Sequence, residues 1–316
     1  MDKKIIIIIV AIIAIIGIAG AYVFMGFGSD DGVVKIGYLP SDHDSALFIA
    51  QADDAYAAEG LDIETVQFNN GGDLMTAMAS GEVDVGYVGI TPVLSSIEKG
   101  VPVKVISGAQ IEGSGLVVGK DSGVSTIEDL DGKSIATPGE ASIQYLLLVY
   151  ALNQSGLSKD NVDISAMKVA PMNDALKSGK IDGMLTYEPF VTIATEKDNG
   201  ILLKSSADIL PGHPCCVVVA SDDFINNNPD ELQIILDIHE NATNYIMENP
   251  DEAATKLPKD IVSDVEIEKK SLANIQFVSG LDESYKQSIL DFMNIQKDLG
   301  LLKEVISADK IFYTPK

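Results

Sequence analysis

The sequence predicts an α/β protein with two lobes built to one plan. Strand-like and helix-like segments alternate, their order recurs after roughly 100 residues, and glycines stand at the ends of the predicted helices. Such alternation is typical of βαβ units, which place parallel strands side by side. We therefore expect a mostly parallel sheet flanked by helices in each lobe. Ligands of open sheets bind beyond the carboxyl ends of the strands, so the cleft between the lobes is the expected binding site.

The two repeats contain the same elements in the same order. The first has a strand at 34–38, a polar loop at 40–45, a helix at 46–59, a strand at 61–63, a helix at 74–79 and a strand at 85–88. The second has a strand at 133–136, a turn at 138–139, a helix at 143–153, a strand at 162–164, a helix at 175–177 and a strand that ends at 186. This agreement over several elements indicates two related lobes rather than chance.

The chain then returns to the first lobe. The apolar run 215–220 predicts a strand, and helices are expected at 229–247, 250–257, near Ser271 and at 282–299. Two crossings, near 113–118 and 213–217, would form the hinge. The expected boundaries are a membrane or signal segment at 1–29, the first part of lobe 1 at 30–116, lobe 2 at 117–212, and the return to lobe 1 at 213–316.

The N-terminus predicts a transmembrane helix. Residues 5–27 carry no charge, and an apolar helix of about 20 residues spans a bilayer. Lys3 and Lys4 precede this segment and Asp30 and Asp31 follow it, which places the rest of the chain outside the cytoplasm. The alternative is a signal segment that is cleaved to release a secreted protein, although such segments have shorter apolar stretches.

Charge and cysteine content exclude several classes of protein. The net charge is −25 and the sequence contains no arginine, so nucleic acid is not an expected partner. The only two cysteines, Cys215 and Cys216, are neighbours, which favours free thiols over a disulfide. We expect no cofactor. We also expect no metal site, because the sequence places no further metal ligands near His43.

Several segments resemble a known family. They are GDLMTAMASGEVDVG at 72–86, KGVPVKV at 99–105, IEDLDGK at 127–133, IATPG at 135–139 and YEPF at 187–190. As a set they resemble the solute-binding proteins for uptake of nitrate, sulfonates, taurine and thiamine precursors. The resemblance implies a type-II periplasmic-binding-protein fold. It also implies a protein that captures a small solute and delivers it to an ABC permease and its ATPase. We expect a monomer.

Residues of loops and helix N-termini at the expected cleft are the candidate ligand contacts. They lie in the loop after the first strand, at matching strand ends in the two lobes, and at the return crossing: Ser41, Asp42, His43, Asp44, Gly89, Thr91, Gly139, Glu140, Ala141, Ser142, Tyr187, Glu188 and His213. Helix N-termini at these places offer unpaired N–H groups to a ligand. The simpler interpretation of several of them is helix capping, and Tyr187 could equally pack beneath a helix.

The absence of arginine from the sequence helps to predict the charge of the solute. Arginine is the usual bidentate partner of sulfonate, nitrate and carboxylate, whereas Asp42, Asp44, Glu140 and Glu188 favour a neutral or cationic solute. A thiamine-pyrimidine-like ring would fit. An oxyanion such as a sulfonate stays an alternative, because helix N-termini, lysines and hydroxyls can also hold it. The competing hypotheses are a thiamine-pyrimidine-synthase-like enzyme on the same fold and a receptor ectodomain. The sequence shows no arrangement of nucleophile and base, so we expect a binding protein that works by hinge closure.

Overall fold

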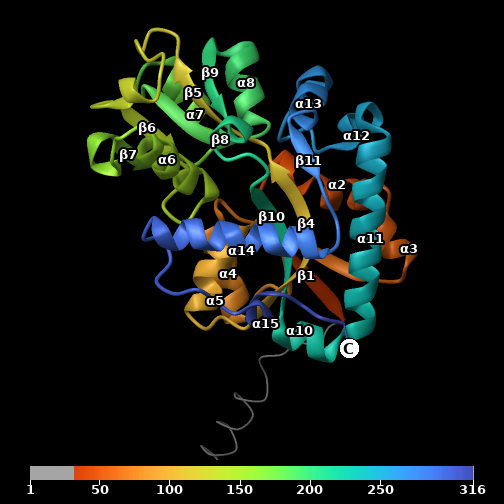
Figure 1. Ribbon diagram of the computed structural model, residues 1–316. Coiled ribbons are helices and arrows are strands. Elements are labelled where there is room, and N and C mark those ends of the chain that lie inside the picture. Colours follow the sequence, from red (N-terminus) through yellow and green to blue (C-terminus); the bar gives the residue numbers. More distant parts are fainter. Residues whose placement is uncertain (1–31, 316) are drawn as a thin grey trace, which may run out of the picture. The chain divides into compact units, whose positions relative to one another are not determined.

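The computed structural model describes residues 32–315, and their strands form two sheets (Figure 1). The expected membrane or signal segment at 1–29 lies outside the described residues. Within residues 32–315, no helix is both long enough and apolar enough to cross a membrane.

Each sheet forms the centre of one lobe. In spatial order, the lobe 1 sheet contains β11 (Ile275–Phe277), β4 (Val103–Glu112), β10 (Pro214–Ser221), β3 (Val85–Gly89), β1 (Val33–Tyr38) and β2 (Asp62–Gln67). The lobe 2 sheet contains β7 (Asp163–Ala166), β6 (Ser134–Thr137), β8 (Gly183–Tyr187), β5 (Ser114–Gly119) and β9 (Gly200–Ser205).

Helices accompany both sheets. Those of the first repeat and the C-terminal part are α2 (Ser45–Ala52), α3 (Ala55–Ala58), α4 (Gly71–Ser80), α5 (Ile90–Glu98), α10 (Asp222–Asn227), α11 (Pro229–Glu248), α12 (Pro250–Lys256), α13 (Val265–Leu272), α14 (Glu283–Asp298) and α15 (Ala308–Ile311). Those of the second repeat are α6 (Ile143–Gln154), α7 (Met172–Lys177), α8 (Phe190–Lys197) and α9 (Ser206–Ile209). The helix expected at 46–59 is interrupted between α2 and α3, where Asp54 has a φ of 53°.

The expectation of mostly parallel sheets is wrong, because both sheets are mixed. In lobe 1, β1 and β3 pair in parallel, while β10 runs antiparallel to both β3 and β4. In lobe 2, β6 pairs in parallel with β7 and β8, while β5 runs antiparallel to β8 and β9. Two of the antiparallel strands, β5 and β10, enter their sheet from the other lobe, arrive from the cleft side and therefore oppose the strands of the βαβ units. The third, β11, is antiparallel to β4 and follows helix α13 of lobe 1.

The two crossings between the lobes lie against each other. One passes from β4 to β5 through Gly113, and the other passes from β9 to β10 through α9. The Glu112 carboxylate accepts a hydrogen bond of 2.7 Å from Gly212 N–H, and Glu112 N–H donates to the His213 carbonyl at 3.3 Å. Glu112 has a φ of 65°, which is strained for a residue with a side chain, and Gly113 follows it with a φ of 74°, which glycine adopts freely. The pair of crossings is a hinge with few chain connections.

Candidate functional site

A cavity of about 40 Å³ lies between the two lobes. Lobe 2 contributes Pro138, Ser142, Ile143, Gln144 and Tyr187. Lobe 1 contributes Leu39, Ser41, His43, Asp44, Asn70, Gly71, Val88, Gly89, Pro92, Cys215 and Cys216. Pockets for organic ligands usually measure about 300–1,000 Å³, whereas a water needs only about 10–15 Å³. This cavity therefore holds a few water-sized groups, and the lobes are in a closed arrangement.

Three helix N-termini converge on the cavity. Asn70 caps α4 by accepting from Asp73 N–H at 2.9 Å, and Ser142 caps α6 by accepting from Tyr145 N–H at 3.1 Å. Gly89 occupies the N-cap of α5 without a side chain of its own, which leaves the first amides of that helix uncapped. The cavity thus receives partial positive charge from the helix ends, and its lining contains no lysine.

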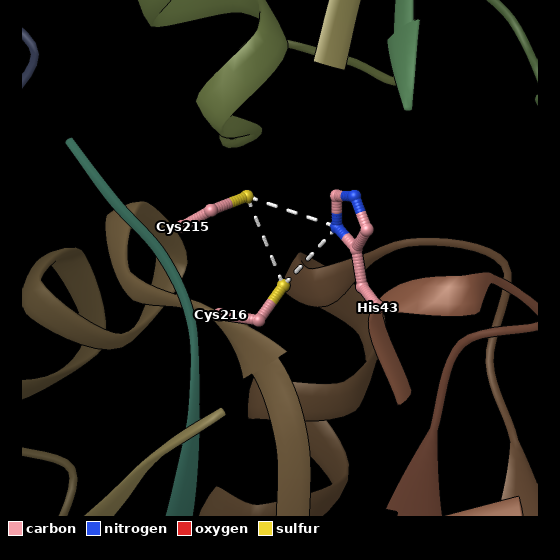
Figure 2. A group of neighbouring side chains, drawn as sticks. All are labelled: His43, Cys215 and Cys216. Carbon is pink, nitrogen blue, oxygen red and sulfur yellow. Dashed lines mark hydrogen bonds between the residues drawn. The ribbon is translucent and has the colours of Figure 1, made fainter. Parts of the chain in front are cut away.

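His43, Cys215 and Cys216 form a buried triangle at the cavity wall (Figure 2). The Nδ1 atom of His43 lies 3.7 Å from the Cys215 sulfur and 3.6 Å from the Cys216 sulfur, and the two sulfurs are 4.0 Å apart. Successive side chains of a regular strand point to opposite faces. Strand β10 is irregular on both sides of Cys216 in its pairing with β4, and this irregularity brings both thiols to the same site.

The hinge fixes the orientation of His43. Its Nε2–H donates to the Gly113 carbonyl at 2.8 Å, so Nδ1 is the ring nitrogen that faces the two sulfurs. A Cβ on residue 113 would lie 2.6 Å from His43 Nε2, and its φ of 74° also disfavours any side chain. Only glycine allows this close approach.

Burial alters the acid–base properties of the cavity wall. Burial raises the pKa of Asp44 to about 8, although Leu39 N–H donates to its carboxylate at 2.8 Å. Burial also raises the pKa of the Cys215 thiol, but hydrogen bonding with Cys216 and the adjacent His43 imidazole outweigh it, so that this pKa lies well below its usual range. Cys215 is therefore the thiol of the pair that ionises first.

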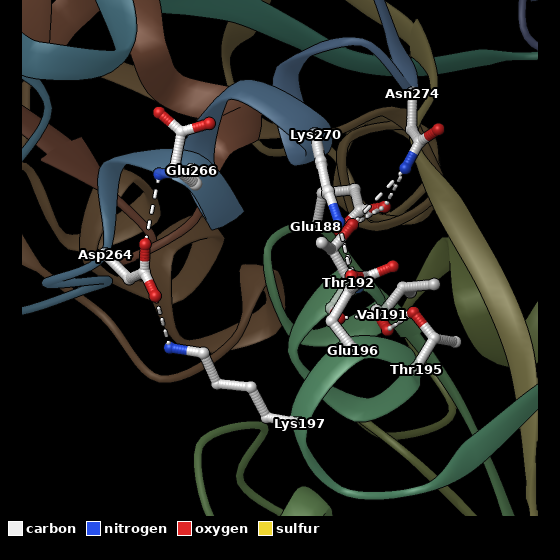
Figure 3. Close-up of polar contacts among 10 residues, drawn as sticks. All are labelled: Glu188, Val191, Thr192, Thr195, Glu196, Lys197, Asp264, Glu266, Lys270 and Asn274. Atoms are coloured by element: carbon white, nitrogen blue, oxygen red, sulfur yellow. Dashed lines mark hydrogen bonds and ion pairs between the residues drawn. The ribbon is translucent and has the colours of Figure 1, made fainter.

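A second polar cluster joins the lobes beside the cavity (Figure 3). Glu188 directly follows lobe 2 strand β8, accepts from Thr192 N–H at 3.0 Å, and accepts from lobe 1 Asn274 Nδ2 at 2.7 Å. Ion pairs Lys270–Glu196 and Lys197–Asp264 connect α13 of lobe 1 to α8 of lobe 2, the latter pair at 3.0 Å. Burial raises the pKa of Glu188 to about 7. These contacts span the two lobes in the closed arrangement.

Six residues predicted from sequence line the cavity: Ser41, His43, Asp44, Gly89, Ser142 and Tyr187. The other predicted residues do not. Asp42 is buried beneath them and bonds Ser271, Thr91 is packed inside lobe 1, and Glu188 caps α8. Gly139 and Glu140 line a separate surface hollow, Ala141 is exposed, and His213 is buried at the hinge.

Sequence reasoning missed several cavity residues. Asn70, Ile143 and Gln144 lie at helix N-termini, a position that could have suggested them. Cys215 and Cys216 were assigned to an ordinary core strand, and no local pattern connects them to His43. Both sulfurs lie beside His43, so potential metal ligands are present near that residue, although the sequence predicts none there.

Comparison with known proteins agrees with this architecture. The model of the NMT1-like family matches residues 28–258. The chain belongs to the NMT1-like family. Among relatives of this NMT1-like protein, the taurine-binding periplasmic protein of Escherichia coli is 30% identical over 233 residues, covering 73% of this chain and 72% of the relative. A putative aliphatic sulfonates-binding protein of Bacillus subtilis is 28% identical over 238 residues, covering 73% and 70%.

A solved structure shares the fold of this NMT1-like protein. The alkanesulfonate-binding protein of Xanthomonas axonopodis superposes with a TM-score of 0.79 at 20% identity, covering 89% of this chain and 98% of that one. The chain therefore has the two-sheet periplasmic-binding-protein fold that its sequence motifs implied.

Proposed function

We propose that this NMT1-like protein is the solute-binding component of an ABC importer and that it encloses a small solute between its lobes. One observation carries this function: the cavity is built from both lobes, and residues of the hinge and of the cleft meet at it. The relatives are named as binding proteins, and this chain is likewise a binding protein rather than an enzyme. The closed lobes must open to admit an organic solute and close again around it.

The lining of the cavity favours a neutral solute over a simple anion. Recognition of sulfonate or nitrate normally uses arginine, which the sequence lacks, and no lysine lines the cavity. Asp44 is protonated near neutral pH because its pKa is about 8, so it can donate a hydrogen bond to the solute. The helix N-termini of α4, α5 and α6 supply further N–H donors. A small, uncharged solute rich in hydrogen-bond acceptors fits these groups.

The partners and location follow from the same role. The closed form would dock on a permease driven by its ATPase, outside the cytoplasm. The apolar segment at 5–27 would tether the protein beside that permease, which raises its effective concentration there. Cleavage of this segment as a signal would instead release the domain.

A thermal-shift screen of the 316-residue chain in EDTA-containing buffer tests this function. The panel would contain pyrimidines, other neutral heterocycles, polyamines, sulfonates and nitrate. A solute at 100 times its dissociation constant adds about 2.7 kcal/mol of stability. We expect one neutral class to raise the melting temperature, and Ser142→Ala, at the cavity, to reduce that effect. Lys120→Ala, at a site outside the cavity, would be the matched control. If no solute in the panel raises the melting temperature, the result contradicts the proposal.

A further inference from the structure

The triangle of His43, Cys215 and Cys216 has the dimensions of a metal site. A tetrahedral zinc ion with Zn–S bonds of about 2.3 Å and Zn–N bonds of about 2.0 Å separates two sulfur ligands by about 3.8 Å and a sulfur from a nitrogen by about 3.5 Å. The same bonds in a trigonal plane give about 4.0 and 3.7 Å. The distances in this protein are 4.0 Å between the sulfurs and 3.7 and 3.6 Å from sulfur to Nδ1. One ion at the centre would reach all three atoms with little movement.

The surroundings of His43 match those of a ligating imidazole. A metal-bound histidine usually donates its second ring N–H to a carbonyl or carboxylate, which fixes the ring and leaves the other nitrogen free for the ion. His43 donates from Nε2 to the Gly113 carbonyl and points Nδ1 at the sulfurs. The contact needs glycine at residue 113, so the hinge backbone itself holds the imidazole in this orientation.

His213 provides an independent observation at the same place. Its Nδ1 contacts the Leu210 carbonyl at 2.8 Å, while its Nε2 is buried and has no hydrogen-bond partner. His213 is only 3% exposed, and it precedes Cys215 by two positions in the chain. A buried nitrogen lone pair without a partner is costly, and in this part of the described chain it is a potential donor that a small movement could bring to a metal ion.

We propose that His43, Cys215 and Cys216 bind a thiophilic transition-metal ion of the Zn²⁺ and Cu⁺ class in the interlobe cavity. Two thiolates and one imidazole are ligands that select these ions over Mg²⁺ or Ca²⁺. All three residues line the cavity, so the remaining coordination position is open to it. The volume of about 40 Å³ suits an ion with a water, whereas an organic solute needs the lobes to open. The metal site depends on the proposed function in one respect: the ion reaches it through the cleft that opens for the solute.

Metal titration of the reduced, metal-free 316-residue chain tests the site. Zn²⁺ would be titrated in competition with a chromophoric chelator, Cu⁺ in a parallel anaerobic arm, and Co²⁺ would report thiolate ligation through its charge-transfer absorption. We expect one ion per chain. Cys215→Ser, Cys216→Ser and His43→Asn should each weaken binding at least about 100-fold and remove the cobalt–thiolate band. His239→Asn removes a buried histidine that bonds Tyr87 and Gly108 instead of the triangle, and Glu140→Gln removes an exposed acid. Neither should change binding.

Three outcomes would overturn the metal site: no ion bound in any arm, binding unchanged in the Cys215→Ser/Cys216→Ser double variant, or several weakly bound ions per chain with no cobalt–thiolate band. Far-ultraviolet circular dichroism of each variant separates lost ligation from lost folding. The failure of this inference is distinguishable from failure of the proposed function. If an organic solute stabilises the protein in EDTA but no metal binds, the solute-binding role stands and the metal site falls. If one metal ion binds per chain but no solute stabilises the protein, the metal site stands and the solute-binding role falls.

Discussion

The Nδ1 atom of His43 lies 3.6 Å from the sulfur of Cys216, although 173 positions separate the two residues in the chain. His43 follows the first strand of lobe 1, and Cys216 lies on the strand that returns from lobe 2. The contact therefore forms only where the hinge, the return crossing and the first loop meet. This meeting point forms one wall of the cavity between the lobes.

Gly89→Val should prevent the lobes from closing without unfolding either of them. A Cβ on residue 89 would lie 3.2 Å from Ile143 Cδ1 in the other lobe, and the ordinary φ of −61° adds no backbone strain. Valine adds further atoms at the same place. We expect solute affinity to fall at least about 10-fold, since closure contributes the lobe 2 contacts. Isothermal titration would measure it.

Ile143→Ala is the compensating change for this prediction. It removes the side chain that the introduced valine would meet, so the double variant Gly89→Val/Ile143→Ala should recover most of the lost affinity. The melting temperature without solute should stay close to that of the wild type for Gly89→Val. An affinity that the double variant does not recover would show that the collision is not what weakens binding.

The buried carboxyl of Glu188 should make stability fall as pH rises. Burial raises its pKa from 4.5 to about 7, so between these values the folded protein holds a proton that the unfolded chain has released. The free energy of unfolding then decreases with rising pH across this window and levels off above it. The total change is about 3 kcal/mol.

Comparison with Glu188→Gln isolates this effect from the other titrating groups. Urea unfolding of both proteins at pH 4.5 and pH 8 gives the difference between their unfolding free energies at each pH. The stability of the wild type relative to the variant should be lower at pH 8 by about 3 kcal/mol. A difference that does not change with pH would contradict the assignment.

The ion pair Lys197–Asp264 should contribute little to closure. It joins α8 to α13 across the lobes, but its two side chains are 46% and 44% exposed. Exposed pairs are worth about 0–1 kcal/mol and are screened by salt. Lys197→Glu should therefore weaken solute binding at most about 5-fold at low ionic strength, and 1 M salt should abolish the effect. The charge-swapped pair Lys197→Glu/Asp264→Lys should restore binding, and a larger loss that persists in salt would argue for a structural role.

Thr91 is expected to be a packing residue rather than a ligand contact. Its side chain is 1% exposed, its Oγ1 has no hydrogen-bond partner, and it does not line the cavity. Thr91→Val replaces an unpaired buried hydroxyl with a methyl group of similar size, so stability should stay equal or rise by about 1 kcal/mol. Solute affinity should not change. Chemical unfolding measures the stability and isothermal titration measures the solute affinity. A loss of affinity would indicate that Thr91 contacts the solute.

The sequence predicted the two-lobed plan because the repeated strands and helices, with their glycine stops, are encoded locally. It also placed Ser41, His43 and Asp44 at the cleft, because they follow a strand whose carboxyl end faces the other lobe. It did not predict the mixed sheets, since strand direction depends on where a crossing enters the sheet. Nor could it place Cys215 and Cys216 together at the cavity. Alternation along a regular strand separates neighbouring side chains, and the irregularity in β10 that reunites them depends on pairing with a distant strand.

Solute binding by a variant whose lobes are joined by a disulfide tests the proposed function most directly. Gly72 of lobe 1 and Ala141 of lobe 2 face each other, with 3.8 Å between the Cβ of Ala141 and a Cβ built on residue 72. This matches the mean spacing of about 3.8 Å in disulfides. In the variant Gly72→Cys/Ala141→Cys, we expect a solute that stabilises the wild type to raise the melting temperature of the reduced form and to have no effect on the oxidised form. Equal stabilisation of the oxidised form would contradict binding by opening and closure of the cleft.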